Sequence, residues 1–238
     1  MTLQALRRHL QNSADPEKAR LLRGFFKTGP GQYGEGDEFL GVVVPTLRKL
    51  AAQCGELRLA DVQALLRSRV HEERLLALLI LVRRFAQSEQ AAQLAIFRLY
   101  LTHRRFVNNW DLVDSSAPHI VGSFLLHRER SLLDWLADSP RLWDRRIAVV
   151  STHCFIRHQD YTSTLRLAAG LLDDPEDLMH KALGWMLREV GKRDQAVLEG
   201  FLREHHGAMP RTMLRYAIER FPEPTRLAYL RGHLPQAA

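Results

Sequence analysis

Apolar residues recur at helical spacing along almost the entire chain, and this pattern constrains the fold more than any other feature of the sequence. Strand signals are scarce, because the one β-branched run, Val42–Val44, is short and ends at Pro45. Breakers separate the periodic segments at Asp15-Pro16, Ser139-Pro140, Asp174-Pro175, Met209-Pro210 and Glu223-Pro224. The sequence therefore predicts an all-α protein.

The periodic segments give the expected helices and one expected irregularity. Pro118 lies inside the segment Trp110–His127, so it should kink that helix or mark its true start. Helices are expected near Gln4–Leu10, Glu17–Phe26, Thr46–Gln53, Leu59–Leu66, Glu72–Phe85, Ala91–Thr102, Trp110–His127, Ser131–Leu136, Leu142–Arg157, Ser163–Leu172, Asp177–Val190, Gln195–His205, Arg211–Phe221 and Thr225–Gly232.

From about residue 70, a long helix alternates with a shorter one. The similar stretches W-D-R-R-I-A-V-V, H-K-A-L-G-W-M-L and R-T-M-L-R-Y-A-I recur at a spacing of roughly 35 residues, which is typical of helical-repeat solenoids. Helix pairs that cannot bury their apolar faces alone stack into a curved rod with a concave surface. Because no linker or low-complexity tract interrupts the pattern, residues 1–238 are expected to form a single domain.

The charge balance favours an acidic partner. The chain has 34 Lys and Arg against 27 Asp and Glu, a net charge of +7, and nucleic acid is the commonest partner of such a protein. The longest apolar run, Leu75–Val82, is too short to span a membrane, and Met1–Leu10 has no signal-peptide core. Cys54 and Cys154 lie among apolar residues and are interpreted as reduced core thiols, so a cytoplasmic protein is expected.

Basic residues recur on one face of three successive long segments. Stacked side by side, these faces would form a positively charged concave groove that binds DNA phosphates independently of sequence. Three ordinary solvated faces would give the same pattern, and that alternative remains open. The residues concerned are Arg146, His153, Arg157, Lys181, Arg188, Lys192, Arg211 and Arg215.

Two tryptophans and a carboxylate interrupt this basic face. Trp110 and Asp114 are an i, i+4 pair in the stretch N-N-W-D-L-V-D-S, so they share one side of a helix. A buried carboxylate needs a partner, which we expect to be Arg146. Trp185 follows a glycine and shares its face with three cations, so we place it in the groove. Trp135 and Trp143 are expected in the core.

An ionised carboxylate between aromatic walls suits cleavage of a glycosidic bond better than cleavage of a phosphodiester, which usually requires metal ions. The transition state of glycosidic cleavage resembles an oxocarbenium ion, which a nearby anion stabilises. An alkylated, cationic base can leave without a general acid. Aromatic faces attract cations by roughly 0.5–2 kcal/mol, so tryptophans would favour such a base over a neutral one.

Other signals do not support a different chemistry. The stretch Gly29–Gly36 is rich in glycine but lacks the phosphate-loop pattern, and we interpret it as a structural loop. The spacing of His153, Cys154 and His158 matches no standard metal site, so no metal is expected. Ser115 is expected to pack or to form a hydrogen bond within its own helix.

A resemblance to a known family rests on three separated motifs in the right order and on the stretch Phe39–Arg48. The motifs are W-D-L-V-D-S at Trp110–Ser115, L-W-D-R-R-I-A at Leu142–Ala148 and K-A-L-G-W-M-L-R-E at Lys181–Glu189. Over essentially its whole length, the chain resembles the DNA alkylation repair enzymes of the AlkD type, which are DNA glycosylases built from HEAT-like repeats.

The resemblance implies that Asp114 is the catalytic carboxylate and that Trp110 and Trp185 contact the lesion nucleotide. It implies further that Arg146 holds Asp114 and the DNA backbone, and that Phe25 takes the place of a further family aromatic. The implied substrates are 3-methyladenine and 7-methylguanine in double-stranded DNA, with no cofactor. A groove that wraps duplex can work as a monomer, which we expect here.

Two hypotheses from other classes remain beside the glycosylase. A non-catalytic helical-repeat protein that binds duplex or branched nucleic acid would also need the basic groove, but it has no use for an anion at position 114. A protein-binding solenoid would use Trp110 and Trp185 as anchors and would show weak salt dependence.

Overall fold

The computed structural model describes residues 1–233, and all of its regular elements in that range are helical. Outside the helices, the described residues contain one isolated parallel bridge, between Glu38 and Val70. The all-α prediction is confirmed. Internal contacts divide the chain into two compact units, Met1–Ile120 and the chain from Val121 onward. The single domain over 1–238 and the concave basic groove stay predictions.

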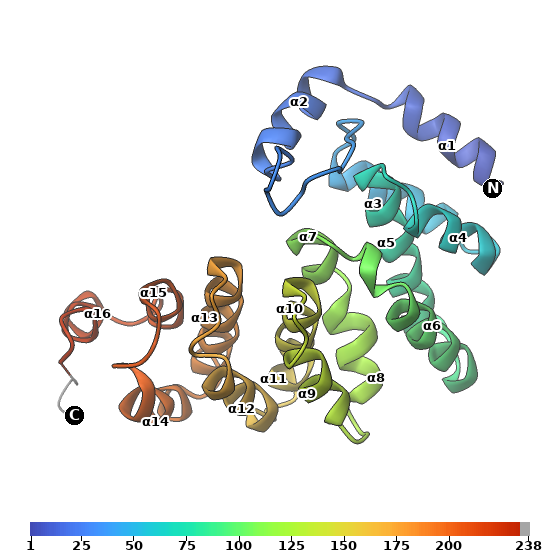
Figure 1. Ribbon diagram of the computed structural model, residues 1–238. Helices are drawn as coiled ribbons and strands as arrows, with labels where there is room; N and C mark the ends of the chain where they lie inside the picture. The colour runs from blue at the N-terminus through green and yellow to red at the C-terminus, as the bar shows by residue number, and fades with distance from the viewer. Residues whose placement is uncertain (234–238) are drawn as a thin grey trace. The chain divides into compact units, whose positions relative to one another are not determined.

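The first unit is built around one long helix. Helix α5 packs against both α3 and α4 and buries Leu75–Leu78, Ile80 and Leu81, whereas Leu79 is only partly buried. Its α-helices, labelled in Figure 1, are α1 (Leu3–Asn12), α2 (Pro16–Phe25), α3 (Val44–Gln53), α4 (Leu59–Leu66), α5 (His71–Gln87), α6 (Gln90–Thr102) and α7 (Trp110–Asp114). The 3-10 turn η1 (Arg104–Phe106) lies between α6 and α7 in the chain.

Short polar residues begin several of these helices, as local sequence preferences require. The Asp15 carboxylate accepts hydrogen bonds from the backbone N–H groups of Glu17 and Lys18 at the start of α2, which has a proline at its first position. The Asn109 side-chain oxygen accepts from the backbone N–H of Trp110 at 2.8 Å. Helix α7 therefore begins at Trp110, which confirms that Trp110 and Asp114 share one helix at i, i+4 spacing.

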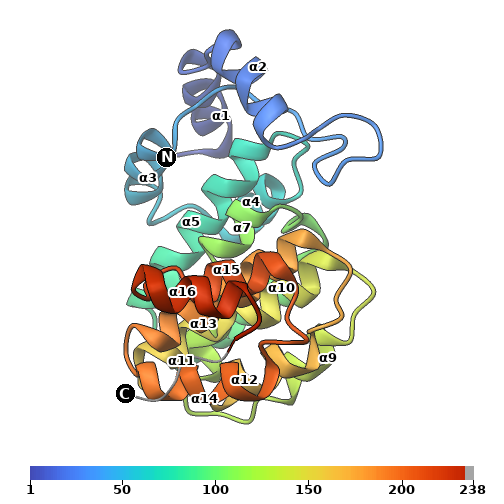
Figure 2. The same ribbon diagram turned by 90° about the vertical axis from the view of Figure 1, so that its left-hand side faces the viewer.

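The second unit has two rows of helices. Helices α10, α13 and α15 lie side by side in one row, and α9, α12 and α14 lie beneath them, as Figures 1 and 2 show. Its elements are the π-helical turn η2 (Pro118–Gly122), which crosses the boundary at 120, α8 (Ser123–Leu125), α9 (Ser131–Ala137), α10 (Leu142–Ser151), α11 (His153–Arg157), α12 (Thr162–Gly170), α13 (Asp177–Gly191), α14 (Gln195–His205), α15 (Arg211–Ala217) and α16 (Glu223–Leu230).

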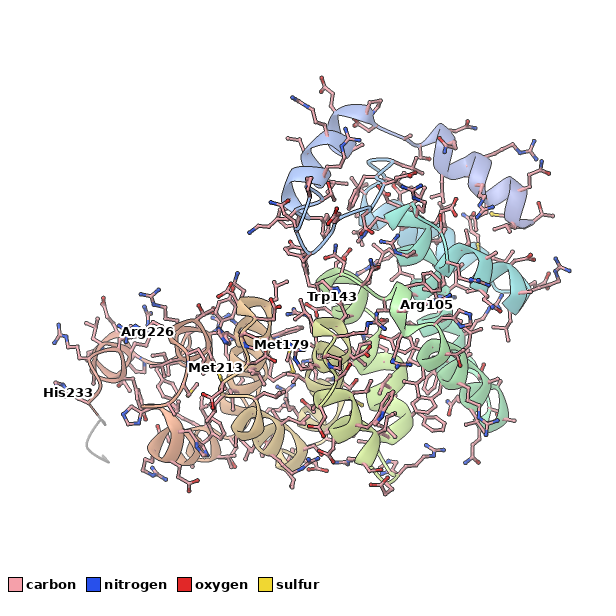
Figure 3. All side chains as sticks on the ribbon, in the orientation of Figure 1. Arg105, Trp143, Met179, Met213, Arg226 and His233 are labelled. Carbon is pink, nitrogen blue, oxygen red and sulfur yellow. The ribbon has the colours of Figure 1, made fainter. Side chains whose placement is uncertain are left out.

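Close approach of α13 and α15 depends on a glycine. A Cβ added at Gly184 would lie 2.5 Å from the backbone oxygen of Met213, which any larger residue would push away. Met179 on α13 and Met213 on α15, labelled in Figure 3, are fully buried. This two-row arrangement is that of a helical-repeat solenoid, and it confirms the predicted fold class.

Two predicted helices are broken in the structure. The segment Trp110–His127 divides into α7, η2 and α8, because Pro118 has no N–H to donate back to the preceding turn. The hydroxyl of Ser115 donates to the Asp111 carbonyl at 2.5 Å, as expected for that residue. The segment Leu142–Arg157 divides at Thr152, whose hydroxyl donates to the Val149 carbonyl at 2.7 Å.

Aromatic and sulfur side chains follow the expectations with one exception. Trp143 is buried, and both cysteines are buried thiols without a disulfide. The core assignment of Trp135 is wrong, because its side chain is 56% exposed on the short helix α9. Within residues 1–233, no helix has both the length and the hydrophobicity that a membrane crossing requires.

Gly41 offers a test of how tightly α2 is packed. Its φ is +85°, and an added Cβ would lie 2.1 Å from the Asp15 carbonyl oxygen. Gly41→Ala should lower the free energy of unfolding by more than about 1 kcal/mol. Gly24→Ala, near the end of α2 with open space around it, is the matched control and should be neutral or stabilising by up to about 1 kcal/mol. Equal stabilities of the two variants in urea denaturation would contradict this packing.

Candidate functional site

A cavity of about 710 Å³ lies in the first unit and brings together three of the predicted site residues. Phe25 at the end of α2 and Trp110 and Asp114 on α7 all line it. The remaining lining comes chiefly from apolar residues of α2, the segment 39–45 that leads into α3, and α5. Sequence reasoning thus found one wall of this cavity, in which a carboxylate lies beside aromatic rings.

Aromatic rings form that wall. The Trp110 ring stacks on Phe26, with centroids 5.3 Å apart and planes 23° apart, and Phe26 stacks in turn on Phe39 at 5.2 Å. Phe25 meets Trp110 edge to face at 5.8 Å. Phe25 is 61% exposed, so its ring is available to a ligand, whereas Phe26 and Phe39 are buried and support the wall from behind.

A buried histidine connects the start of α5 to the start of α7. The Nε2 atom of His71 lies 2.7 Å from a carboxylate oxygen of Asp111, and its Nδ1 atom lies 3.1 Å from Asp37. The imidazole ring also packs on Phe26 and Phe39, with centroids 4.8 and 4.7 Å away. His71 therefore holds the residue next to Trp110 and supports the aromatic wall at the same time.

The surroundings of His71 favour its charged form. Burial alone would lower the pKa of His71, but the hydrogen bonds to Asp111 and Asp37 outweigh it and raise the pKa above its ordinary value. Burial likewise opposes ionisation of Asp37, yet the contacts with His71 and Arg74 lower the pKa of that carboxyl. An ion cluster with both signs of charge therefore borders the cavity, whose lining includes His71 and Asp111.

A second buried carboxylate shapes the part of the cavity that precedes α3. Glu72 on α5 accepts hydrogen bonds from the backbone N–H groups of Leu40 at 3.1 Å, Gly41 at 2.7 Å and Val42 at 3.3 Å. These bonds fix the irregular segment before α3 and thus the position of Val43 and Val44 at the cavity. The carboxylate satisfies backbone donors that would otherwise be buried without partners.

Sequence reasoning missed His71, Glu72, Phe26 and Phe39. The signal that could have found the first two is the run H-E-E-R, whose polar residues directly precede the longest apolar run of the chain, Leu75–Val82. A polar cluster at the buried start of a helix needs partners from other elements. Sequence alone could not name those partners, because Asp37 and Asp111 lie 34 and 40 residues away from His71.

The second unit brings together two other predicted residues. His153 at the start of α11 lies against Trp185 on α13, with ring centroids 5.9 Å apart, and both are half-buried. Glu189, one turn beyond Trp185, is buried, and its ionised form interacts with His153. Burial raises the pKa of Glu189, but Lys192 and Arg193 outweigh that effect and lower it.

The predicted cations of α13 have acidic partners. Lys181 pairs with Asp177 at 2.7 Å, Lys192 pairs with Glu189 at 2.6 Å, and Arg188 pairs with Glu219. The stripe is thus less positive than its lysines and arginines alone suggest. DNA binding by Lys181, Arg188 and Lys192 stays a prediction, because a phosphate would have to compete with these carboxylates.

The remaining predicted cations differ in exposure. Arg146 is only 5% exposed and donates to the Leu178 carbonyl, because it lies where α10 packs on α13. Its proposed contacts with Asp114 and with DNA stay predictions. The other three, Arg157, Arg211 and Arg215, are exposed at the end of α11 and on α15.

The cavity suits a flat, positively charged ligand. Aromatic faces attract cations, and a carboxylate at the same wall adds an opposite charge. Most of the lining surface is apolar, so a bound group would be shielded from water, and the polar residues of the lining are Lys18, Arg48, His71, Glu72, Asp111, Asp114 and Ser115. Among residues 1–233, no group of three or more His, Cys, Asp or Glu side chains is arranged to hold a metal ion.

The His71 cluster predicts a pH dependence of stability. Because the pKa of His71 is raised in the folded state, its contribution is fully present below the ordinary value of 6.5 and is lost as pH rises through the folded pKa. The free energy of unfolding should fall by up to about 1.4 kcal/mol per pH unit over that interval. His71→Gln should remove this slope.

Urea denaturation between pH 6 and 9 checks that slope. His9→Gln is the control, because His9 is exposed on α1 and should leave the slope as it is in the wild type. A His71→Gln variant with the wild-type slope would show that the imidazole is neutral in the fold.

Comparison with known proteins gives two findings. Residues 6–221 match the model of a family described as DNA alkylation repair enzyme. A solved structure described as a predicted DNA alkylation repair enzyme from Enterococcus faecalis is similar with a TM-score of 0.69 and 16% sequence identity, over 89% of this chain and 98% of that one. At this identity the likeness concerns the fold. No match was found among proteins of curated function.

Proposed function

Because the chain belongs to the DNA alkylation repair enzyme family, we propose that it is a monofunctional DNA glycosylase. Its substrates would be purines alkylated at N3 or N7, such as 3-methyladenine and 7-methylguanine, in double-stranded DNA. The observation that carries the proposal is the cavity lined by Phe25, Trp110 and Asp114. It combines aromatic faces and a carboxylate, the two features that a cationic nucleotide requires.

Both the positive charge of the alkylated base and the Asp114 carboxylate would contribute to the reaction. Alkylation at N3 or N7 makes the base cationic, so the bond between C1′ and the base nitrogen can break with its electron pair moving to the base. The sugar then develops positive charge, which the Asp114 carboxylate would stabilise. The same carboxylate would position a water molecule, whose oxygen adds to C1′ while its proton passes to Asp114 and on to solvent, giving an abasic site and the free base. This hydrolysis of the bond between C1′ and the base nitrogen needs no cofactor.

The aromatic wall would supply selectivity. Trp110 and Phe25 would attract the alkylated base while it is cationic and lose that attraction when it leaves as a neutral product. His153 and Trp185 in the second unit would contact the nucleotide strand through a second aromatic face. Exposed arginines of the same unit, Arg157, Arg211 and Arg215, would bind phosphates of any sequence.

The direct test is base release from N-methylated duplex DNA, with free methylpurines measured by chromatography. Asp114→Asn should reduce release by about 10²–10³-fold, because it removes the charge and keeps the shape. Its affinity for duplex should stay the same or rise. Asp138→Asn is the matched control, since Asp138 is exposed just beyond α9 and should keep full activity.

Two outcomes would count against the proposal. If neither the wild type nor Asp114→Asn releases base while both bind duplex in a salt-dependent way, the protein is a non-catalytic binder of nucleic acid. If Asp114→Asn loses binding and release in parallel, Asp114 has a structural role and the reaction depends on another group.

A further inference from the structure

A cluster of arginines on the first unit lies outside the cavity. Arg67 follows α4 directly, and Arg105 is on the turn η1, where Figure 3 labels it. Their guanidinium carbons lie 5.9 and 4.7 Å from the centroid of the same ring, that of Phe106. We propose that Arg67 and Arg105, held over Phe106, form a binding site for backbone phosphates of duplex DNA.

The charge of this pair is not neutralised. Within residues 1–233, neither Arg67 nor Arg105 forms an ion pair with a carboxylate, and both are exposed. The cations of α13 differ in this respect, because Lys181, Arg188 and Lys192 each have an acidic partner. Two adjacent unpaired arginines favour an anion from outside the chain.

The turn that carries Arg105 and Phe106 is fixed. The His103 ring stacks on Phe106 with planes 23° apart, and its two nitrogens lie 3.0 Å from the Leu99 carbonyl and 2.9 Å from the side-chain nitrogen of Gln63. A guanidinium that rests on an aromatic ring keeps its N–H edge in water. That edge matches the two oxygens of a phosphate, and the stacking reduces the entropy lost on binding.

The same contacts argue against a site for an unpaired base. A base would need an open aromatic face, but Arg67, Arg105 and His103 all lie against Phe106. The cluster therefore offers charge and directed donors without a stacking platform. Phosphates bind such a site regardless of sequence or damage.

The proposal takes duplex DNA as the partner from the proposed function, but its test does not depend on base release. Affinity for an undamaged duplex is measured by fluorescence anisotropy at several salt concentrations. A double variant, Arg67→Gln with Arg105→Gln, should bind more weakly, and the slope of log K against log salt should fall by about 0.9 for each arginine.

Two control variants separate charge from fold. Arg98→Gln removes an exposed arginine of α6 and should leave the slope unchanged. Phe106→Leu keeps both charges, so it should weaken binding with little change in slope. The proposal would be overturned if the slope of log K against log salt for the double variant equalled that of the wild type, or if it were no lower than that of Arg98→Gln. The proposal would also be overturned if the wild type bound single-stranded DNA more tightly than duplex DNA and the double variant lost that preference for the single strand.

Discussion

The buried ion cluster at the start of α5 is the interaction on which the first unit depends. His71 joins Asp37 to Asp111, Arg74 pairs with Asp37 at 2.6 Å, and Glu72 holds the backbone of the segment before α3. Removing one partner would leave a buried charge unpaired, which costs several kcal/mol. The cluster thus fixes α2, α7 and the segment between α2 and α3 around one helix.

The candidate site follows from this constraint. Asp111 is held by His71, so α7 has a fixed start, and Trp110 stacks on the ring of Phe26 that also contacts His71. Asp114, one turn later, lines the cavity beside Trp110. The two carboxylates of α7 therefore have different tasks: Asp111 anchors the helix, and Asp114 lines the cavity where we propose that the chemistry takes place.

Sequence reasoning predicted local features better than long-range ones. Helical periodicity and breaker residues predicted the fold class and most helix positions, and the i, i+4 spacing placed Trp110 and Asp114 together. Sequence reasoning failed where distant residues decide: the partners of His71, the pairing of Arg188 with Glu219, and the burial of Arg146. The other two acids, Asp177 and Glu189, lie within one turn of Lys181 and Lys192, so their pairing was readable from the sequence. Trp135 was misplaced because a short helix leaves one side in solvent, which periodicity over few residues does not reveal.

The central claim is that the aromatic wall and Asp114 recognise positive charge on a base. The most direct measurement compares two duplexes, one with a 7-methylguanine nucleotide stabilised against loss of the base and one with its neutral 7-deaza isostere. The account predicts tighter binding of the cationic duplex by about 2–30-fold, the equivalent of roughly 0.5–2 kcal/mol, and loss of that preference in Trp110→Leu. Equal affinity of the wild type for both duplexes would contradict it.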